Sequence, residues 1–251
     1  MRFIFAAFVL AIAAAAWADF QVPELTGPIV DNAHLFQPDE AAQLSDFLRD
    51  IAAHGKVQIQ VLTVPNLGGE EIEQASIQVT DKWKLGKAGK DNGVLIMITK
   101  QEHKMRIEVG QGLEGNIPDA IANRIIYNTM RPLFRDGQFA QGTYAGIVRI
   151  LSYADPGYLK QLEKNGGVAV STDYDNGAPV PLSKAIMFIF MLVFLGPWLF
   201  FALTGGGFWG GFGGGLGGFG GFGGGGFGGF GGGGWGGGGG GFSGGGASGG
   251  W

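Results

Sequence analysis

Cysteine is absent from this chain of 251 residues, and histidine occurs only three times. Without cysteine the protein has no disulfide, no thiol nucleophile, no cysteine-type zinc site and no iron–sulfur cluster. The three histidines, His34, His54 and His103, do not have the spacing of a zinc-binding helix motif. The Ser-x-x-Lys motif and the Walker A loop are also missing from the sequence. Gly110–Gly115 matches the letters of a dinucleotide-binding loop, but it follows a predicted edge strand and does not open a Rossmann unit.

Charge is scarce in this chain, and neither sign occurs after Lys184. Lysine and arginine together number 17 against 21 aspartates and glutamates, which gives a formal net charge of −4 at pH 7. A net acidic chain is poorly suited to neutralising nucleic-acid phosphates. We therefore expect no nucleic-acid partner.

The first residues of the chain form an apolar segment that is typical of a secretory signal. Arg2 is its one charge, and the segment ends in the small-x-small triplet Ala16-Trp17-Ala18. This pattern predicts cleavage before Asp19, although an uncleaved N-terminal membrane anchor is the alternative.

A second apolar run, Ala185–Leu203, contains no charged residue. At about 1.5 Å per residue it is long enough to cross a hydrocarbon core of ~30 Å, and a buried core helix of this length is the alternative. We expect five segments: a signal peptide (1–18), a globular α/β domain (19–164), a linker (165–184), a transmembrane helix (185–203) and a disordered glycine-rich tail (204–251). The expected location is the cytoplasmic membrane, crossed once. The domain is expected in the periplasm or outside the cell, and the tail in the cytoplasm.

The tail holds most of the chain's 51 glycines, with phenylalanine and tryptophan interspersed. High backbone entropy and the lack of an aliphatic core predict disorder, and hence no contribution to the core of the domain. The aromatic residues leave two interpretations open, an inert tail or one that associates with itself or with the membrane surface.

Hydrophobic periodicity predicts an alternation of helices and strands in the domain. The expected helices cover Gln37–Ala53, Glu70–Trp83, Pro118–Phe134 and Gln138–Tyr153, and the expected strands cover Val57–Val64, Val94–Thr99 and Met105–Val109. A strand–helix–strand unit implies a right-handed crossover between parallel strands, and the short turn before the third strand implies an antiparallel hairpin. We therefore predict a three-layer α/β/α sandwich with a small mixed sheet.

Several acidic side chains lie in loops at the ends of the predicted elements: Asp31, Asp91, Glu114 and Asp119. Oxygen ligands in loops suit hard ions such as Ca²⁺ or Mg²⁺. Each residue also has an ordinary explanation, since aspartate is common in turns and in the first turn of helices. The chemistry alone leaves both explanations open.

Four blocks of the sequence resemble the TPM domain: Val30–Phe36, Lys90–Ile96, Arg106–Gly115 and Pro118–Ala120. The resemblance covers about Thr26 to Tyr153. The order of signal, domain, span and glycine-rich tail is similar to the membrane-anchored bacterial branch of that family.

The resemblance implies the same three-layer α/β/α fold. It also implies calcium in the acidic loops, with Asp31, Glu114 and Asp119 as the first candidates and Asp91 behind them. A LemA-type membrane protein is the implied partner, and acid phosphatase activity has been assigned to one plant member. Two hypotheses follow: a tethered interaction or assembly module that binds a divalent ion, or a phosphatase that uses metal-bound water at the acidic loops.

Overall fold

The computed structural model describes residues 20–165 and 241–251 of the chain. The predicted signal peptide and the predicted span Ala185–Leu203 lie outside the described residues, as does nearly all of the predicted linker. Within the two described ranges, no helix is both long and apolar enough to cross a membrane.

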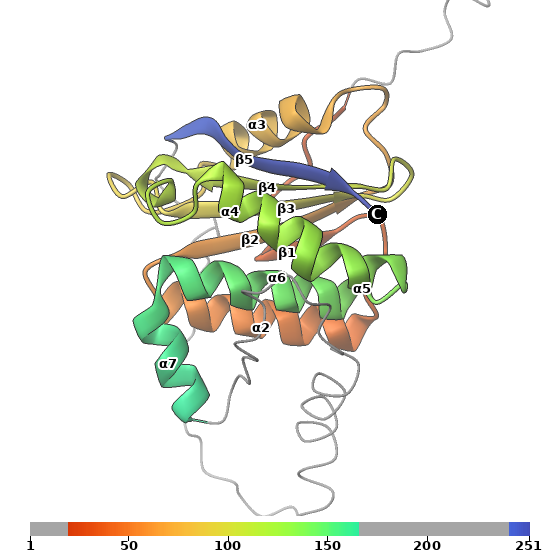
Figure 1. Cartoon of the computed structure of the whole chain (residues 1–251). Coiled ribbons are helices and arrows are strands. Elements are labelled where there is room, and N and C mark those ends of the chain that lie inside the picture. The colour runs from red at the N-terminus through yellow and green to blue at the C-terminus, as the bar shows by residue number, and fades with distance from the viewer. Residues whose placement is uncertain (1–19, 166–240) are drawn as a thin grey trace, which may run out of the picture. The chain divides into compact units, whose positions relative to one another are not determined.

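The described residues form a five-stranded sheet with helices on both faces (Figure 1). The strands are β1 (Ile29–Asp31), β2 (Gln58–Val64), β3 (Gly93–Thr99), β4 (Lys104–Gly110) and β5 (Phe242–Gly250). The helices are α2 (Pro38–His54), α3 (Ile72–Trp83), η1 (Gln111–Leu113), α4 (Asp119–Arg124), η2 (Ile125–Met130), α5 (Arg131–Arg135), α6 (Phe139–Ala154) and α7 (Pro156–Lys164).

The strands follow one another across the sheet in chain order, from β1 at one edge to β5 at the other. β1, β2 and β3 are parallel, whereas β4 pairs antiparallel with β3 and β5 pairs antiparallel with β4. The predicted parallel crossover and the predicted hairpin are therefore confirmed. The sheet has two more strands than predicted, because β1 is only three residues long and β5 lies in a segment without a strand pattern.

Two hydrophobic clusters fill the space on either side of the sheet. One lies between the sheet and the helices α2, α4, α6 and α7, and the other lies between the sheet and α3. Figure 1 shows the same layers, with α3 on one side of the strands and α2 and α6 on the other. The predicted α/β class and mixed sheet are confirmed. All seven residues of β3 are buried, as expected for a central strand that is covered on both faces.

The helix predicted over Pro118–Phe134 is divided in the structure by a π-helical stretch, Ile125–Met130, which ends just before Pro132. Proline has no N–H to donate to the carbonyl of Asn128 one turn earlier, which favours a wider turn at this place. Helix α7 was not predicted as an element. It begins where the backbone N–H of Tyr158 donates to Asp155 Oδ1 at 3.1 Å, with Pro156 at its first position.

The prediction that the whole tail from 204 to 251 is disordered is wrong for its end. Phe242–Gly250 is the edge strand β5, and Ala247 is buried in the larger hydrophobic cluster. An unpaired sheet edge presents a row of backbone donors and acceptors, and β4 would have such an edge without β5. Glycine does not prevent pairing here because the strand is held by its neighbours and not by its own propensity.

A candidate strand-binding edge on β4

The backbone of β4 forms a nearly continuous ladder with β5, which runs beside it along its full length (Figure 1). The register pairs Lys104 with Gly250 at one end and Gly110 with Phe242 at the other, with an irregularity between Glu108 and Gly110. Next to the Lys104–Gly250 pair, the backbone N–H of Trp251 donates to the carbonyl of His103 at 3.1 Å. We call β4 and the side chains that contact β5 the β4 edge site.

Three of the four predicted metal ligands belong to the β4 edge site, where they accept hydrogen bonds from the C-terminal segment. The backbone N–H of Gly241 donates to Asp91 Oδ1 at 3.1 Å, and that of Gly246 donates to Asp119 Oδ1 at 2.8 Å. Between them, the hydroxyl of Ser243 donates to Glu114 Oε1. These carboxylates come from three different loops or helix starts, so the fold brings them to the same strand.

Two glycines explain how the loop with Asp91 approaches the end of β4. A Cβ on Gly112 would lie 1.8 Å from the carbonyl oxygen of Lys90, and one on Gly110 would lie 2.3 Å from that of Asp91. The backbone N–H of Gly112 also donates to the Asp91 carbonyl at 3.1 Å. Only glycine permits this close approach, which accounts for the first two of the three glycines that resemble a dinucleotide motif.

Asp31, the fourth predicted ligand, lies at the opposite end of the sheet. It is at the carboxyl end of β1, and its carboxylate accepts hydrogen bonds at 3.0 Å from the backbone N–H groups of Leu35 and Phe36 and a further one from the Thr63 hydroxyl. The carboxylate therefore holds the turn that precedes α2. The structure does not bring Asp31 to the other three acids.

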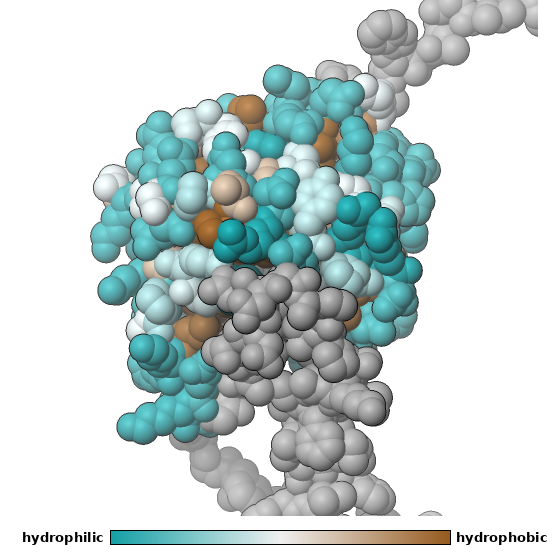
Figure 2. Space-filling model, in the orientation of Figure 1, coloured by the Kyte–Doolittle hydropathy of each residue, from teal (hydrophilic) through white to brown (hydrophobic). Residues whose placement is uncertain are grey.

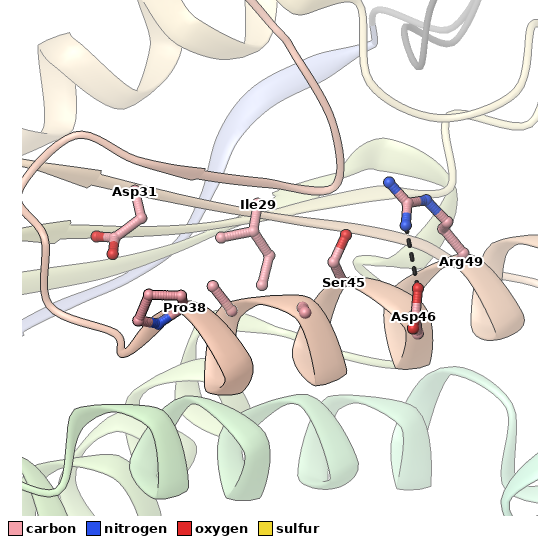
Figure 3. Close-up of a pocket in the computed structure, with 8 residues that line it drawn as sticks. Ile29, Asp31, Pro38, Ser45, Asp46 and Arg49 are labelled. Atoms are coloured by element: carbon pink, nitrogen blue, oxygen red, sulfur yellow. Dashed lines mark hydrogen bonds and ion pairs between the residues drawn. The ribbon is translucent and has the colours of Figure 1, made fainter. Parts of the chain in front are cut away.

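Asp31 also lines a shallow pocket of about 370 Å³ between β1 and α2. Figure 3 shows Asp31 at one end of this pocket and the exposed pair Asp46–Arg49 at the other, with 3.1 Å between the paired atoms. Within the two described ranges, no group of three histidine, aspartate or glutamate side chains is placed to hold a metal ion. The ion therefore stays a prediction.

A buried ion pair forms the middle of the β4 edge site. Arg106 Nε lies 2.6 Å from Glu108 Oε2, with side-chain exposures of 7% and 0%. Ser76 Oγ donates to the same carboxylate oxygen at 3.0 Å. The other two guanidinium nitrogens donate to the C-terminal strand, one to Ser248 Oγ at 3.0 Å and one to the carbonyl of Gly244 at 3.1 Å.

In this arrangement β5 supplies two of the hydrogen-bond acceptors of the buried Arg106 guanidinium. A buried charge is costly unless it is paired and its remaining donors are satisfied, and two of the Arg106 donors reach their partners only when β5 is docked. Burial raises the pKa of Glu108, against the lowering effect of Arg106 and Ser76. Removing β5 would therefore disturb a pair that sequence reasoning did not identify.

Glu73 on α3 adds a second polar contact to Ser248. Partial burial acts to raise the pKa of Glu73, but the hydrogen bond from Ser248 and the positive charges of Arg106 and Lys104 outweigh it, so the pKa is lowered from its ordinary 4.5. The ionised carboxylate is the form that the strand stabilises.

Aromatic rings hold the end of the chain. The ring centroid of Trp251 lies 5.1 Å from that of Phe134, 6.0 Å from that of Phe139 and 5.5 Å from that of His103, in edge-to-face arrangements. Such pairs contribute about 0.5–1.5 kcal/mol each beyond the burial of their area.

Tyr127 is the one large hydrophobic side chain that is exposed among residues 20–165 and 241–251. The visible surface of that part is accordingly mostly hydrophilic (Figure 2).

The docked strand requires glycine at particular positions. At Gly246 the φ angle is +137°, and a Cβ would lie 2.0 Å from the carbonyl oxygen of Ile107. At Gly249 a Cβ would lie 2.6 Å from Ile126 Cγ2, and at Gly244 the φ angle is +83°. The β4 edge site therefore selects a strand by small size as well as by hydrogen bonds.

Together, the mixed sheet and its edge site define an α/β domain whose last strand, β5, pairs with β4. Residues 29–153 match the family model described as "TPM domain". The chain belongs to the TPM-domain family, and this confirms the resemblance of its motifs.

Solved structures of bacterial proteins are similar to this chain. The N-terminal domain of a P. gingivalis protein is 30% identical, over 54% of this chain and 86% of that one, with a TM-score of 0.49. The protein BA42 of Bizionia argentinensis is 20% identical, over 47% and 83% of the two chains, with a TM-score of 0.40. The N-terminal domain of cg2496 from Corynebacterium glutamicum is 15% identical, over 57% and 91%, with a TM-score of 0.41. No curated protein matches the sequence.

Sequence reasoning missed the partner of the acidic residues. One signal was present: the regular glycine–phenylalanine spacing of the tail gives way near its end to the segment Phe242–Trp251, which contains two serines and one alanine. Such a change of composition indicates a segment with its own contacts. Its position beside β4 depends on tertiary structure.

Proposed function

We propose that this protein is an exported, membrane-tethered interaction module whose TPM domain binds extended glycine-rich strands along β4. The observation that supports the proposal most directly is the docking of β5, which pairs with the backbone of β4 and contacts the side chains of the β4 edge site. Addition of a strand to a sheet edge is a common mode of peptide recognition, in which the backbone ladder gives affinity and side chains give specificity.

The specificity in this proposal comes from side chains outside the ladder. Asp91, Glu114 and Asp119 accept from one part of the strand, Arg106 donates to its serine and to a carbonyl, and the aromatic rings contact its terminal tryptophan. A catalytic role would leave these groups facing a substrate, whereas here they face a polypeptide. The geometry therefore favours binding over hydrolysis.

Export and tethering come from the sequence pattern and stay proposals. They need one revision, because a tail on the cytoplasmic side of a single crossing could not reach a domain on the other side. Docking of β5 requires Trp251 and the domain to be on the same side of the membrane. We therefore place residues 241–251 outside the cytoplasm, together with the domain, and give up the single crossing at Ala185–Leu203. The tether is then the uncleaved N-terminal segment, which the sequence left open as the alternative to a cleaved signal. A LemA-type membrane protein remains the partner that the family resemblance suggests.

The test uses the full chain with the substitution Gly246→Val, which releases the strand because a side chain at this position would overlap the Ile107 carbonyl. A fluorescent peptide with the sequence of residues 241–251 is titrated into this variant. We expect saturable binding, and none with a peptide that carries the same Gly-to-Val change. Gly115→Val is the matched control, since a Cβ there meets nothing within 4 Å. Absence of peptide binding to the folded Gly246→Val chain would contradict the proposed function.

The phosphatase hypothesis stays a prediction with a simple test. Turnover of an aryl phosphate that depends on added divalent ion, and that is lost in Asp91→Ala and Asp119→Ala, would reverse the preference for a binding module. We expect no such turnover.

A further inference from the structure

The edge site is matched to the end of this same chain at several independent positions. Glycine is needed at 246 and 249, the hydroxyl of Ser248 meets Arg106, and Trp251 meets three rings. A strand that satisfies all of these positions is an unusual sequence, and the chain itself supplies one. This argument rests on the proposed function, because it concerns the source of the strand that the edge site binds.

β5 can leave the domain without dismantling it. The strand is at the sheet edge and at the end of the chain, and among the described strands it pairs with β4 alone. Ala247 is its one buried hydrophobic residue, while Phe242 and Trp251 pack at the margins of the two clusters. Exchange of such a terminal element between identical chains needs little unfolding.

The connection to β5 is long enough to reach another molecule. Residues 166–240 separate the two described ranges, and roughly 75 residues can span at most about 250–270 Å at ~3.3–3.6 Å per residue. A domain of this size has a diameter of roughly 40 Å. The chain length therefore permits a strand to pair either with its own domain or with that of a neighbouring copy on the same membrane.

We infer that a second copy of this chain is a physiological donor of the strand, so that tethered copies are joined by exchange of β5. The strand of each copy then competes with that of its neighbour for one edge site. In a strand exchange of this kind, the contacts within and between chains are identical, and local density decides between them.

The absence of cysteine permits a direct test by cross-linking in membranes that hold the full chain. Lys104 is paired with Gly250, and the next pair along the two strands is His103 with Trp251, which is hydrogen-bonded. Hydrogen-bonded and non-hydrogen-bonded pairs alternate in an antiparallel ladder, so Lys104 and Gly250 form a non-hydrogen-bonded pair. The two Cα atoms of such a pair are ~4.5 Å apart, within the range that a disulfide bridges. Copies with Lys104→Cys are mixed with copies with Gly250→Cys under mild oxidation.

We expect a disulfide-linked dimer of one copy of each kind. Its yield should rise several-fold when the Lys104→Cys copy also has Gly246→Val, which removes its own strand from the site. The yield should fall to background when Gly246→Val is placed in the Gly250→Cys copy. Lys160→Cys, exposed on α7, replaces Lys104→Cys in the collision control.

A double variant with both cysteines in one chain separates the two proposals. Cross-linking within that chain, together with no dimer even after the acceptor strand is released, would overturn the exchange between copies and leave strand binding intact. Cross-linking of the Gly250→Cys copy to a different protein instead would also overturn it. Failure of the double variant to form any disulfide would contradict the pairing of β5 with β4, and with it the proposed function.

Discussion

The backbone N–H of Gly246 donates a hydrogen bond of 2.8 Å to Asp119 Oδ1, across 127 positions of the sequence. Asp119 is the first residue of α4, where a carboxylate also interacts favourably with the helix dipole. Asp119, which the family resemblance implied as a candidate metal ligand, thus accepts a hydrogen bond from the end of the chain. This hydrogen bond links the domain, which holds the clearest sequence motifs, to the glycine-rich tail, which has no strand pattern.

Release of β5 by Gly246→Val should expose the backbone of β4. The substitution puts a side chain on a residue whose φ angle is +137°, and its Cβ would overlap the Ile107 carbonyl. Backbone strain of this kind costs about 1–3 kcal/mol. We expect hydrogen exchange of the β4 amides that face β5 to increase by about tenfold or more, while β2 amides keep their rates. Equal exchange rates in Gly246→Val and in the control Gly115→Val would contradict the docked strand.

Trp251→Ala should weaken docking more than Trp251→Phe does. Alanine loses the contacts with Phe134, Phe139 and His103, and a loss of about 2 kcal/mol, or some thirtyfold in affinity, follows if each aromatic pair contributes about 0.5–1.5 kcal/mol. Peptides with the two changes are titrated into the Gly246→Val chain. Equal affinity of the alanine peptide and the unchanged peptide would show that the rings do not hold the strand.

Acid should weaken strand binding in part through Glu73. The pKa of this group is lowered in the folded protein, and the Ser248 hydrogen bond is one cause. A lowered pKa means that the stabilisation is fully present above the ordinary value of 4.5 and is lost as the pH falls through the lowered value. Peptide affinity measured from pH 6 down to pH 3.5 should therefore fall less steeply in Glu73→Gln. Parallel curves for the variant and the unchanged chain would remove Glu73 from the explanation.

Adding divalent ions can distinguish the acidic residues beside β5 from Asp31 at the other end of the sheet. If calcium binds among Asp91, Glu114 and Asp119, millimolar calcium should raise the melting temperature, because a ligand that binds only the folded state stabilises it. Asp119→Asn should then reduce the increase. Asp31→Asn should leave it unchanged, since Asp31 lies at the other end of the sheet and is hydrogen-bonded to a turn. An unchanged melting curve at millimolar calcium would end the ion hypothesis.

Both described ranges should be accessible from outside the cell. Single cysteines at Lys160→Cys and Gly250→Cys, in a chain without native cysteine, can be labelled in intact cells with a reagent that does not cross membranes. We expect both to be labelled, and the degree at Gly250→Cys to rise when Gly246→Val is added. Labelling of the first site with full protection of the second until lysis would place the tail in the cytoplasm and contradict docking.

The central strands and most helices could be predicted from the sequence because their signals are local. Residues 93–99 form an almost wholly apolar run, and Met105, Ile107 and Val109 alternate with polar residues, so β3 and β4 were predicted to within one residue at each end. The hairpin and the parallel crossover follow from connection lengths. The π-helical stretch could not be predicted from periodicity, because its six residues make fewer than two turns and are too few to define a period.

The sequence by itself determined the α/β class and the order of the strands β2 to β4. It also drew attention to Asp91, Glu114 and Asp119, but as ligands of a metal ion that stays a prediction. Only the tertiary structure decided that Asp31 is separate from the other three acids, that Arg106 and Glu108 form a buried pair, and that Phe242–Gly250 is a strand. The physical reason is the same in each case. A glycine-rich segment has no hydrophobic period and weak strand propensity, so its conformation is imposed by an unpaired edge and by side chains more than a hundred residues away in sequence.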